Sequence, residues 1–229
     1  MTVPNARPKA FSPDQIASAA LEILEKEGPE ALSFRRVGEA LGTSHVTVYR
    51  RCGSFEGLLD LCADHVAADF PEIDESLDWV TATQLRFEAA YEMWAEHSDL
   101  ILLMKGRSWQ GQNIISKFYE PAMRTIVEAG LSLPEAARVF SILYRLTIGS
   151  VISTRANHWN PWDGRNAIEK LGPEKFPTLV EVGRVVDNSD LRAIFRDTLH
   201  LLIVDLGPAD RQSPDPKTRD SKSRARKAR

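Results

Sequence analysis

The stretch Ala31–Leu59, ALSFRRVGEALGTSHVTVYRRCGSFEGLL, decides the fold because its spacing, capping and charge agree. Its first half has apolar residues at i, i+3 and i+7, which predict one buried stripe on a short helix. These residues are Phe34, Val37 and Leu41. Gly42 ends this helix, since glycine readily adopts the left-handed conformation, and Ser44 is a favourable N-cap for a second helix. Two short helices joined by a glycine-containing turn predict a helix-turn-helix.

The second helix, His45 to Arg51, has too many polar side chains to be a core helix. Val48 and Cys52 continue the inner stripe, which leaves hydroxyl, aromatic and guanidinium groups on the open faces. Such groups contact base edges and phosphates in a major groove. Together with two arginines of the preceding helix, the predicted DNA-binding residues are Arg35, Arg36, Ser44, His45, Thr47, Tyr49, Arg50 and Arg51. A solvated helical hairpin with surface arginines is the alternative.

Residues 12–62 resemble the N-terminal domain of the tetracycline-repressor (TetR) family of transcriptional regulators. The resemblance rests on the run LGTS-x-VTVYRR followed by SFEGLL. The matching positions are Leu41, Gly42, Ser44, Thr47, Val48, Tyr49, Glu56, Leu58 and Leu59. The resemblance implies that Tyr49 and Thr47 touch the DNA backbone or base edges and that Arg35 reaches a base in a groove.

Two positions depart from the family pattern. Cys52 stands where an aromatic residue is usual, and Phe55 stands where a lysine often binds a phosphate. Because cysteine is a small, core-compatible residue, the first departure does not affect the predicted fold. The second leaves the set of phosphate contacts less well defined.

The net charge of -3 conceals an uneven distribution. Residues Asp210 to Arg229 contain eight Lys or Arg against three Asp, and Ala31 to Phe55 contain four Arg against one Glu. Positive charge therefore collects in the tail and in the predicted helix-turn-helix, as expected for a nucleic-acid contact.

The chain divides into four predicted parts. Residues 1–10 form a flexible arm, and residues 11–70 form the helix-turn-helix domain. Residues 71–207 form a larger helical domain for ligand binding and dimerisation, and residues 208–229 form a disordered basic tail. The first helix starts with the capping box Ser12-Pro13-Asp14-Gln15. The fourth helix, Phe55 to Phe70, joins the two domains.

Four further helices are predicted in the larger domain, beginning with a stripe from Phe87 to Trp94 that ends at His97-Ser98. The others run from Leu100 to about Arg107, from Asn113 to Ala129 with a break at Pro121, and from a capping box at Ser132 to Asn157. A long loop, His158 to Asn188, precedes a last helix, Ser189 to Leu206. No stretch shows sustained strand alternation, so the fold is predicted to be all-α.

No catalytic signature, metal-ligand spacing or phosphate-binding loop occurs in the sequence, so neither an enzyme nor a cofactor is expected. Cys52 and Cys62 are interpreted as packed helix residues. The start of the chain lacks the apolar region of a signal peptide, and no apolar run approaches the roughly 18 residues of a membrane helix. A cytoplasmic protein without membrane association is expected.

The larger domain is rich in aromatic residues that could line a ligand cavity between helices. The residues predicted to bind a small molecule are Trp94, Met104, Trp109, Phe118, Tyr144 and Arg145. The alternative is that the aromatic rings form only the core. Arg145 is the most informative of the set, because an arginine on an apolar helix covers its neighbours, pairs with a carboxylate, or meets an anionic ligand.

These observations predict a homodimeric transcriptional regulator, most simply a repressor that binds palindromic operator DNA and is released by a small-molecule effector. The resemblance implies dimerisation through Pro134–Asn157 and Ser189–Leu206. A helical ligand-binding or scaffold protein without specific DNA binding is the competing class, and a small enzyme is a third. The exposed set Thr47, Tyr49, Arg50 and Arg51 favours the regulator, because a scaffold does not require it.

Overall fold

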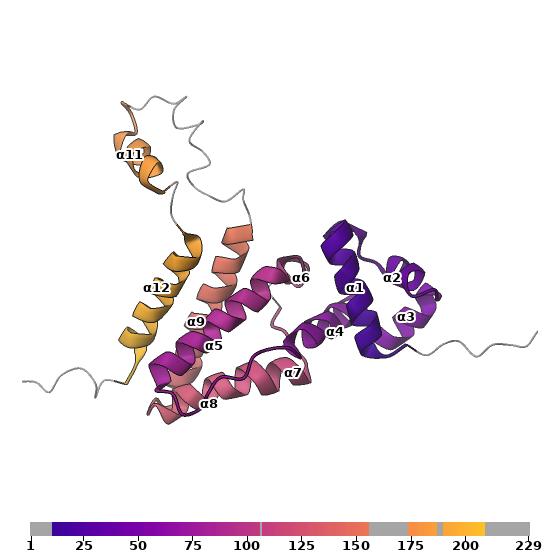
Figure 1. Cartoon of the computed structure of the whole chain (residues 1–229), viewed down its shortest axis with the longest axis horizontal. Coiled ribbons are helices and arrows are strands. Elements are labelled where there is room, and N and C mark those ends of the chain that lie inside the picture. Colours follow the sequence, from indigo (N-terminus) through magenta and orange to yellow (C-terminus); the bar gives the residue numbers. More distant parts are fainter. Residues whose placement is uncertain (1–10, 106, 156–173, 187–189, 209–229) are drawn as a thin grey trace, which may run out of the picture.

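The computed structural model describes residues 11–105, 107–155, 174–186 and 190–208. Within these ranges every regular element is helical and no strand occurs, which confirms the all-α prediction. Figure 1 shows α1, α2 and α3 gathered at one end, with α4 leading from them towards a larger body that contains α5, α8, α9 and α12. The predicted arm and tail, residues 1–10 and 209–229, lie outside the described residues.

Five short elements form the N-terminal body. They are α1 (Pro13–Glu27), η1 (Pro29–Ala31), α2 (Phe34–Ala40), α3 (His45–Cys52) and α4 (Phe55–Ala67). The predicted capping box is present at the start of α1: the Ser12 hydroxyl accepts from the Gln15 amide, and the Gln15 side chain accepts from the Ser12 amide. The apolar face of α1 packs on α4, and Val37 of α2 and Val48 of α3 are fully buried beside it.

In the described part of the larger body, eight elements follow. They are α5 (Trp79–Glu96), α6 (Ser98–Leu103), α7 (Gln112–Ile114), the π-helical turn η2 (Ile115–Tyr119), α8 (Glu120–Glu128), α9 (Leu133–Arg155), α11 (Pro177–Val186) and α12 (Leu191–Leu206). The central helix is α5, which packs against α8, α9 and α12. In Figure 1, α11 stands apart from the other described helices.

Several predicted boundaries are wrong by a few residues, and one element is different in kind. The connecting helix ends at Ala67 rather than Phe70, and the helix expected from Leu100 to Arg107 runs from Ser98 to Leu103. The predicted break at Pro121 is a π-helical turn over Ile115–Tyr119. Because proline has no amide hydrogen to donate to the carbonyl four residues earlier, the backbone widens just before it.

The last described helix starts at Leu191, since Asp190 caps it by accepting from the amides of Arg192 and Ala193 at 2.9 and 3.2 Å. The expected loop from His158 to Asn188 contains α11 in its described part. Residues 156–173 and 187–189, which include the end of the predicted dimerisation helix at Asn157 and the predicted start at Ser189, lie outside the described residues.

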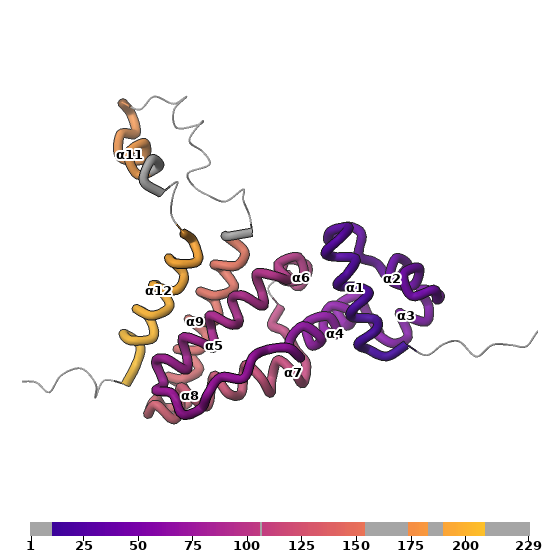
Figure 2. The backbone as a smooth tube through the Cα atoms, viewed as in Figure 1, coloured from indigo at the N-terminus to yellow at the C-terminus, as the bar shows by residue number. Residues whose placement is uncertain are grey.

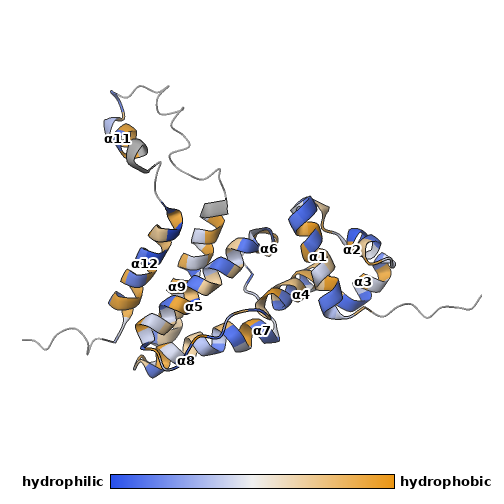
Figure 3. Ribbon diagram, in the orientation of Figure 1, coloured by the Kyte–Doolittle hydropathy of each residue, from blue (hydrophilic) through white to orange (hydrophobic). Residues whose placement is uncertain are grey.

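The long helix α9 is more apolar than the sequence analysis recognised. Its segment Leu133–Ser153 has a mean hydropathy of 1.2 and, by length and composition alone, could cross a membrane, contrary to the expectation that no segment qualifies. Only 28% of the residues in that segment are buried. A long apolar helix with a large uncovered surface is equally typical of a subunit interface, and Figure 3 shows further apolar residues on the visible side of neighbouring α12.

Candidate nucleic-acid interface and ligand cavity

The helix-turn-helix is built by close backbone approach between α2 and α3. A Cβ added at Gly38 would lie 3.0 Å from the Thr43 carbonyl oxygen, so α2 needs glycine there. Gly42 has φ +65°, the left-handed conformation that favours glycine in the turn. The Ser44 hydroxyl then caps α3 by accepting from the Thr47 amide at 3.2 Å. These contacts fix the angle at which α3 leaves the turn.

Burial divides α3 into an inner and an outer side. Val48 is 1% exposed, while His45, Tyr49, Arg50 and Arg51 are exposed. The Tyr49 ring packs edge-on against Phe34 with centroids 5.5 Å apart, yet the residue remains 51% exposed. The helix therefore presents aromatic and cationic groups to solvent from a fixed apolar base.

Three of the four predicted DNA-binding arginines pair with groups inside the domain. Arg36 forms a two-pronged ion pair with Glu27 of α1, with Nη2–Oε1 at 2.6 Å and Nε–Oε2 at 2.9 Å. The Arg51 Nε donates to the Phe11 carbonyl oxygen at 3.2 Å. Arg35 pairs with Glu39 one turn away on the same helix. Arg35 is the most exposed of the three, with 85% of its side chain accessible.

One exposed residue of α3 was not predicted. Val46 is 43% exposed on the outer side, next to Thr47. An apolar side chain does not by itself indicate a DNA contact, since the predicted contacts rest on polar and aromatic groups. A methyl-rich side chain on such a surface matches the C5-methyl group of thymine, which is part of major-groove recognition.

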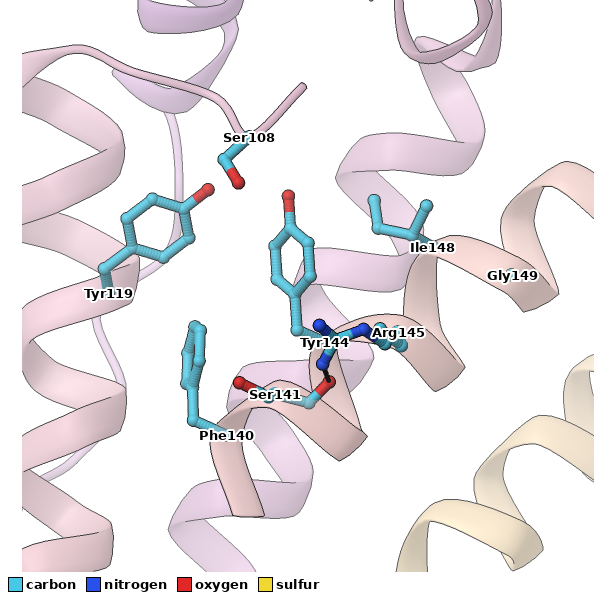
Figure 4. Close-up of a pocket in the computed structure, with 8 residues that line it drawn as sticks. All are labelled: Ser108, Tyr119, Phe140, Ser141, Tyr144, Arg145, Ile148 and Gly149. Atoms are coloured by element: carbon cyan, nitrogen blue, oxygen red, sulfur yellow. Dashed lines mark hydrogen bonds between the residues drawn. The ribbon is translucent and has the colours of Figure 1, made fainter. Parts of the chain in front are cut away.

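The larger body contains a cavity of about 510 Å³ between η2, α9 and the segment before α7. It is lined by Ser108, Tyr119, Phe140, Ser141, Tyr144, Arg145, Ile148 and Gly149. Figure 4 shows the hydroxyl groups of Ser108, Tyr119 and Tyr144 converging at one end, with Phe140 beside Tyr144 at the other. The Phe140 and Tyr144 rings stack with centroids 5.9 Å apart.

The polar groups of the cavity are arranged to donate hydrogen bonds. Burial raises the pKa of both Tyr119 and Tyr144 above the ordinary value, so both hydroxyls stay protonated at neutral pH. The buried Tyr119 hydroxyl lies near the Tyr144 hydroxyl and the Trp109 backbone, but it makes no hydrogen bond of good geometry within the described part of the chain. Arg145 donates to the Ser141 carbonyl oxygen at 3.1 Å and remains exposed at the rim.

Two of the six predicted ligand-binding residues, Tyr144 and Arg145, line this cavity. The other four, Trp94, Met104, Trp109 and Phe118, are at most 2% exposed and form the core behind it. Trp94 contacts the wall through an edge-on packing on Tyr144, with centroids 5.2 Å apart. Six lining residues are absent from the predicted set: Ser108, Tyr119, Phe140, Ser141, Ile148 and Gly149. The small ones give no sequence signal for a cavity, and the larger ones have the pattern of core residues.

A polar link connects the cavity to α4. Arg107 directly precedes the cavity residue Ser108 and pairs with Asp60 of α4. Its Nη2 donates to Asp60 Oδ2 at 2.9 Å and to Oδ1 at 3.0 Å. Just before the π-helical turn that carries Tyr119, the Asn113 backbone N–H donates to Asp64 Oδ1 at 2.7 Å. The Asn113 side-chain Nδ2 donates to the Asp64 carbonyl oxygen at 3.1 Å and to Asp64 Oδ2 at 3.2 Å, and only these two bonds depend on the asparagine side chain. A Cβ at Gly111 would lie 2.2 Å from Asp64 Oδ1, so the contact requires glycine. The cavity wall is thus fastened to α4 at two points.

Two family models match the chain. The model described as "Bacterial regulatory proteins, tetR family" matches residues 16–62, and that described as "Tetracyclin repressor-like, C-terminal domain" matches residues 70–206. The first match contains the helix-turn-helix, and the second contains the cavity.

Curated relatives and solved structures are similar along much of the chain. The HTH-type transcriptional repressor DrrR1 of Streptomyces coeruleorubidus is 27% identical over 153 residues, which are 66% of this chain and 56% of that protein. The tetracycline repressor protein class D of Escherichia coli is 24% identical over 196 residues, 83% of this chain and 86% of that protein. The chain therefore spans little more than half of the first relative and most of the second.

Among solved structures, apo ActR from Streptomyces coelicolor superimposes with a TM-score of 0.73 at 26% identity, covering 87% of this chain and 96% of ActR. ActR in complex with actinorhodin superimposes with a TM-score of 0.71 at 27% identity, covering 86% and 96%. The likeness extends over both bodies of the fold.

Proposed function

The chain belongs to the tetR family of bacterial regulatory proteins, and from this premise we propose that it is a transcriptional repressor that a small molecule releases from operator DNA. The observation that carries the proposal is the outer side of α3. Tyr49 and Arg50 are exposed there, while Val48 anchors the same helix in the core. An enzyme or a scaffold has no need of this arrangement, whereas a recognition helix has.

The proposed DNA contacts fall into two groups. The first group faces the major groove and consists of His45, Thr47, Tyr49 and Arg50. Val46 joins this group as a contact to the methyl group of a thymine. Arg35 reaches a base in a groove, and Arg36, Arg51 and Ser44 lie around this surface and approach phosphates. Arg36 and Arg51 exchange or share their present partners on binding, which makes them the weaker candidates.

The proposed assembly is a homodimer through the described parts of Pro134–Asn157 and Ser189–Leu206. On α12 three apolar side chains are exposed on the side opposite its buried face: Ile194, Leu201 and Val204. Their exposed fractions of 49–68% would be costly for an isolated subunit, and two copies joined there cover one another. Such a dimer reads a palindrome, because each subunit presents one α3. We place this DNA-bound protein in the cytoplasm.

The proposed effector site is the cavity lined by Tyr119, Tyr144 and Phe140. ActR, a neighbour in fold, was solved in complex with actinorhodin, so that compound is a suitable first probe. Binding can be followed through tryptophan fluorescence, because Trp94 packs on the cavity residue Tyr144. Quenching by actinorhodin that is lost in Tyr144→Ala would support the site, and unchanged quenching in that variant would reject it for this probe.

A gel-shift titration against fragmented genomic DNA tests the DNA-binding proposal. In the presence of excess random competitor DNA, the protein is expected to retain a subset of fragments. The Tyr49→Ala, Arg50→Ala double variant is expected to lose them while melting at the same temperature. A scaffold protein would retain no fragment, and equal retention by both proteins would remove α3 from the proposed interface.

A further inference from the structure

Helix α5 buries an arginine whose Nε has no hydrogen-bond acceptor in the described structure. Arg86 is 3% exposed, and its Nε has no hydrogen-bond partner among the residues that the structure describes. Burial lowers the pKa of its guanidinium, and the nearby Glu75 carboxylate offsets only part of this effect. Charged side chains are rarely buried without a partner, because losing hydration is unfavourable unless an opposite charge or acceptor replaces the water. The buried Arg86 Nε therefore needs an acceptor that the described structure does not supply.

The guanidinium of Arg86 lines a cleft of about 620 Å³. Its walls are α5, η2 and α8, and its roof is the segment Phe70–Glu75 that joins α4 to α5. Figure 2 shows this segment running alongside α7 and α8 on its way to α5. The cleft shares no lining residue with the aromatic cavity that contains Tyr119. It is a second, separate site.

A smaller cleft of about 230 Å³ continues from the first, and the two share Glu75, Pro121 and Arg124. It is lined by Trp79, two turns before Arg86 on α5, whose indole Nε1 is also buried without a described partner. Tryptophan Nε1 is only a donor, and so is the guanidinium. Two unsatisfied donors on one side of α5 thus face adjoining clefts.

Most of the other charged groups around the clefts already have partners. Arg124 pairs with Glu75 at 3.1 Å, and Lys117 donates to the Ala68 carbonyl oxygen. Asp74 accepts from the Ser76 amide at 2.8 Å. Glu72 on the roof and Glu128 in the smaller cleft are the remaining carboxylates, and both are exposed. Glu75 also acts on the charge of Arg86, but its carboxylate is paired with Arg124 and the Arg86 Nε has no acceptor. Arg86 is therefore the cation that an incoming acceptor would satisfy.

We propose that this α5–α8 cleft binds a small-molecule oxyanion, held by the Arg86 guanidinium and flanked by Arg124 and Lys117. The guanidinium presents donors in a planar fork that matches a carboxylate or a phosphate. A ligand with a second acceptor reaches the Trp79 Nε1 past the Arg124–Glu75 pair. Since the roof is the connection between α4 and α5, the ligand fastens that connection to α5 and α8. The site extends the proposed function by adding a second ligand class.

The test is a thermal-unfolding titration of the full-length protein with sodium phosphate and, separately, sodium benzoate. Sodium chloride at matched ionic strength is the reference. Variants are Arg86→Met, which keeps an unbranched apolar side chain but removes the guanidinium, and Lys26→Met, which removes one charge from an exposed site on α1. Tyr119→Phe reports on binding in the aromatic cavity instead.

At least one of the two oxyanions is expected to raise the unfolding temperature of wild type and of Lys26→Met by several degrees more than chloride does. This shift should saturate as the oxyanion concentration rises. Arg86→Met should lose this shift and, without ligand, should melt at the same or a higher temperature because an unpaired buried cation is gone. A shift that survives in Arg86→Met, or one that chloride matches, overturns the proposal. A benzoate shift that is lost in Tyr119→Phe but kept in Arg86→Met would also overturn it, because benzoate would then bind in the aromatic cavity. A marked loss of stability in Arg86→Met would overturn it as well, because Arg86 would then have a structural role.

Discussion

At the scale of single residues, Tyr49 shows how α3 separates packing from recognition. Its ring rests edge-on against Phe34 at 5.5 Å, and about half of the residue remains exposed. One face of the side chain thus supports the helix, and the rest is available to DNA. Substitutions that remove the ring and the hydroxyl separately can therefore distinguish the two contributions.

Tyr49→Ala is expected to weaken binding to the selected DNA by about 1 to 3 kcal/mol, the usual effect of removing a well-placed contact. Tyr49→Phe keeps the ring on Phe34 and should lose only the part due to the hydroxyl. Gel-shift titrations measure both, and thermal unfolding is the control for the fold. Affinities that are equal in wild type and Tyr49→Ala would show that Tyr49 does not touch DNA.

Val48→Asp is expected to have the opposite profile. Val48 is 1% exposed, so an aspartate there would bury a carboxylate without a partner and unfold the N-terminal body. Circular dichroism should show loss of helix at temperatures where wild type and Tyr49→Ala are folded. A folded Val48→Asp protein would mean that α3 is not anchored by this residue.

Tyr119→Phe tests the donor character of the aromatic cavity. The hydroxyl is buried and makes no hydrogen bond of good geometry in the described structure, so its removal should leave stability unchanged or slightly higher. Affinity for a ligand that accepts a hydrogen bond there should fall by about 0.5 to 1.5 kcal/mol, the usual net value of a neutral hydrogen bond. Calorimetry measures the affinity, and a clear loss of stability without loss of affinity would contradict this role.

At the scale of elements, α4 is the part that can carry a change in the cavity to α3. Its N-terminal half packs beneath the helix-turn-helix through Leu58 and Leu59, which are at most 2% exposed. Its outer side is fastened to the segment before η2 by the Arg107–Asp60 and Asn113–Asp64 contacts. A ligand that displaces Ser108 or Tyr119 pulls on both contacts.

Arg107→Met combined with Asn113→Ala is therefore expected to uncouple the two sites. Effectors typically change the affinity of a coupled site by about 1 to 3 kcal/mol, and the double variant should lose most of this effect while binding ligand and DNA separately. DNA titrations with and without ligand measure the coupling. Lys26→Met, which breaks an exposed ion pair with Glu22 on α1, is the control and should retain it.

Element boundaries were predictable where the sequence contains a local chemical signal. The capping boxes at Ser12 and Ser132 mark the starts of α1 and α9, and Gly42 marks the turn before α3. The π-helical turn before Pro121 could not be predicted, since proline signals an interruption without specifying its form.

The sites were less predictable than the elements because tertiary packing decides them. The outer side of α3 follows from helical periodicity alone. In the larger body the same periodicity cannot distinguish a ring in the core, such as Trp94, from one at a cavity, such as Tyr119. Arg86 was missed because α5 is covered on several sides by α8, α9 and α12, whereas one apolar stripe was expected.

At the scale of the whole molecule, the uncovered apolar surface of α9 and α12 is the feature that one chain leaves unexplained. Leu201 is 68% exposed and Val204 is 54% exposed on the same side of α12. Subunit association through these helices would cover that surface and hold two α3 helices at a fixed separation. The dimer is then a requirement for reading two half-sites.

Leu201→Glu is expected to convert the protein to a monomer at micromolar concentration, because it places two charges at the centre of the proposed interface. Leu102→Glu, at a 47% exposed site on α6, is the matched control and should remain dimeric. Sedimentation velocity measures both. A dimeric Leu201→Glu protein, or a monomeric wild type, would place the interface elsewhere.

The most direct test of the central claim is to sequence the genomic fragments that the purified protein retains. A two-fold dimer with one α3 per subunit predicts an enriched inverted repeat whose half-site centres lie about 34 to 36 Å apart, or a multiple of that spacing, along the duplex. The Tyr49→Ala, Arg50→Ala variant should enrich no sequence. Fragments without a common sequence, or the same enrichment in that variant, would contradict the claim that this chain is a sequence-specific DNA-binding regulator.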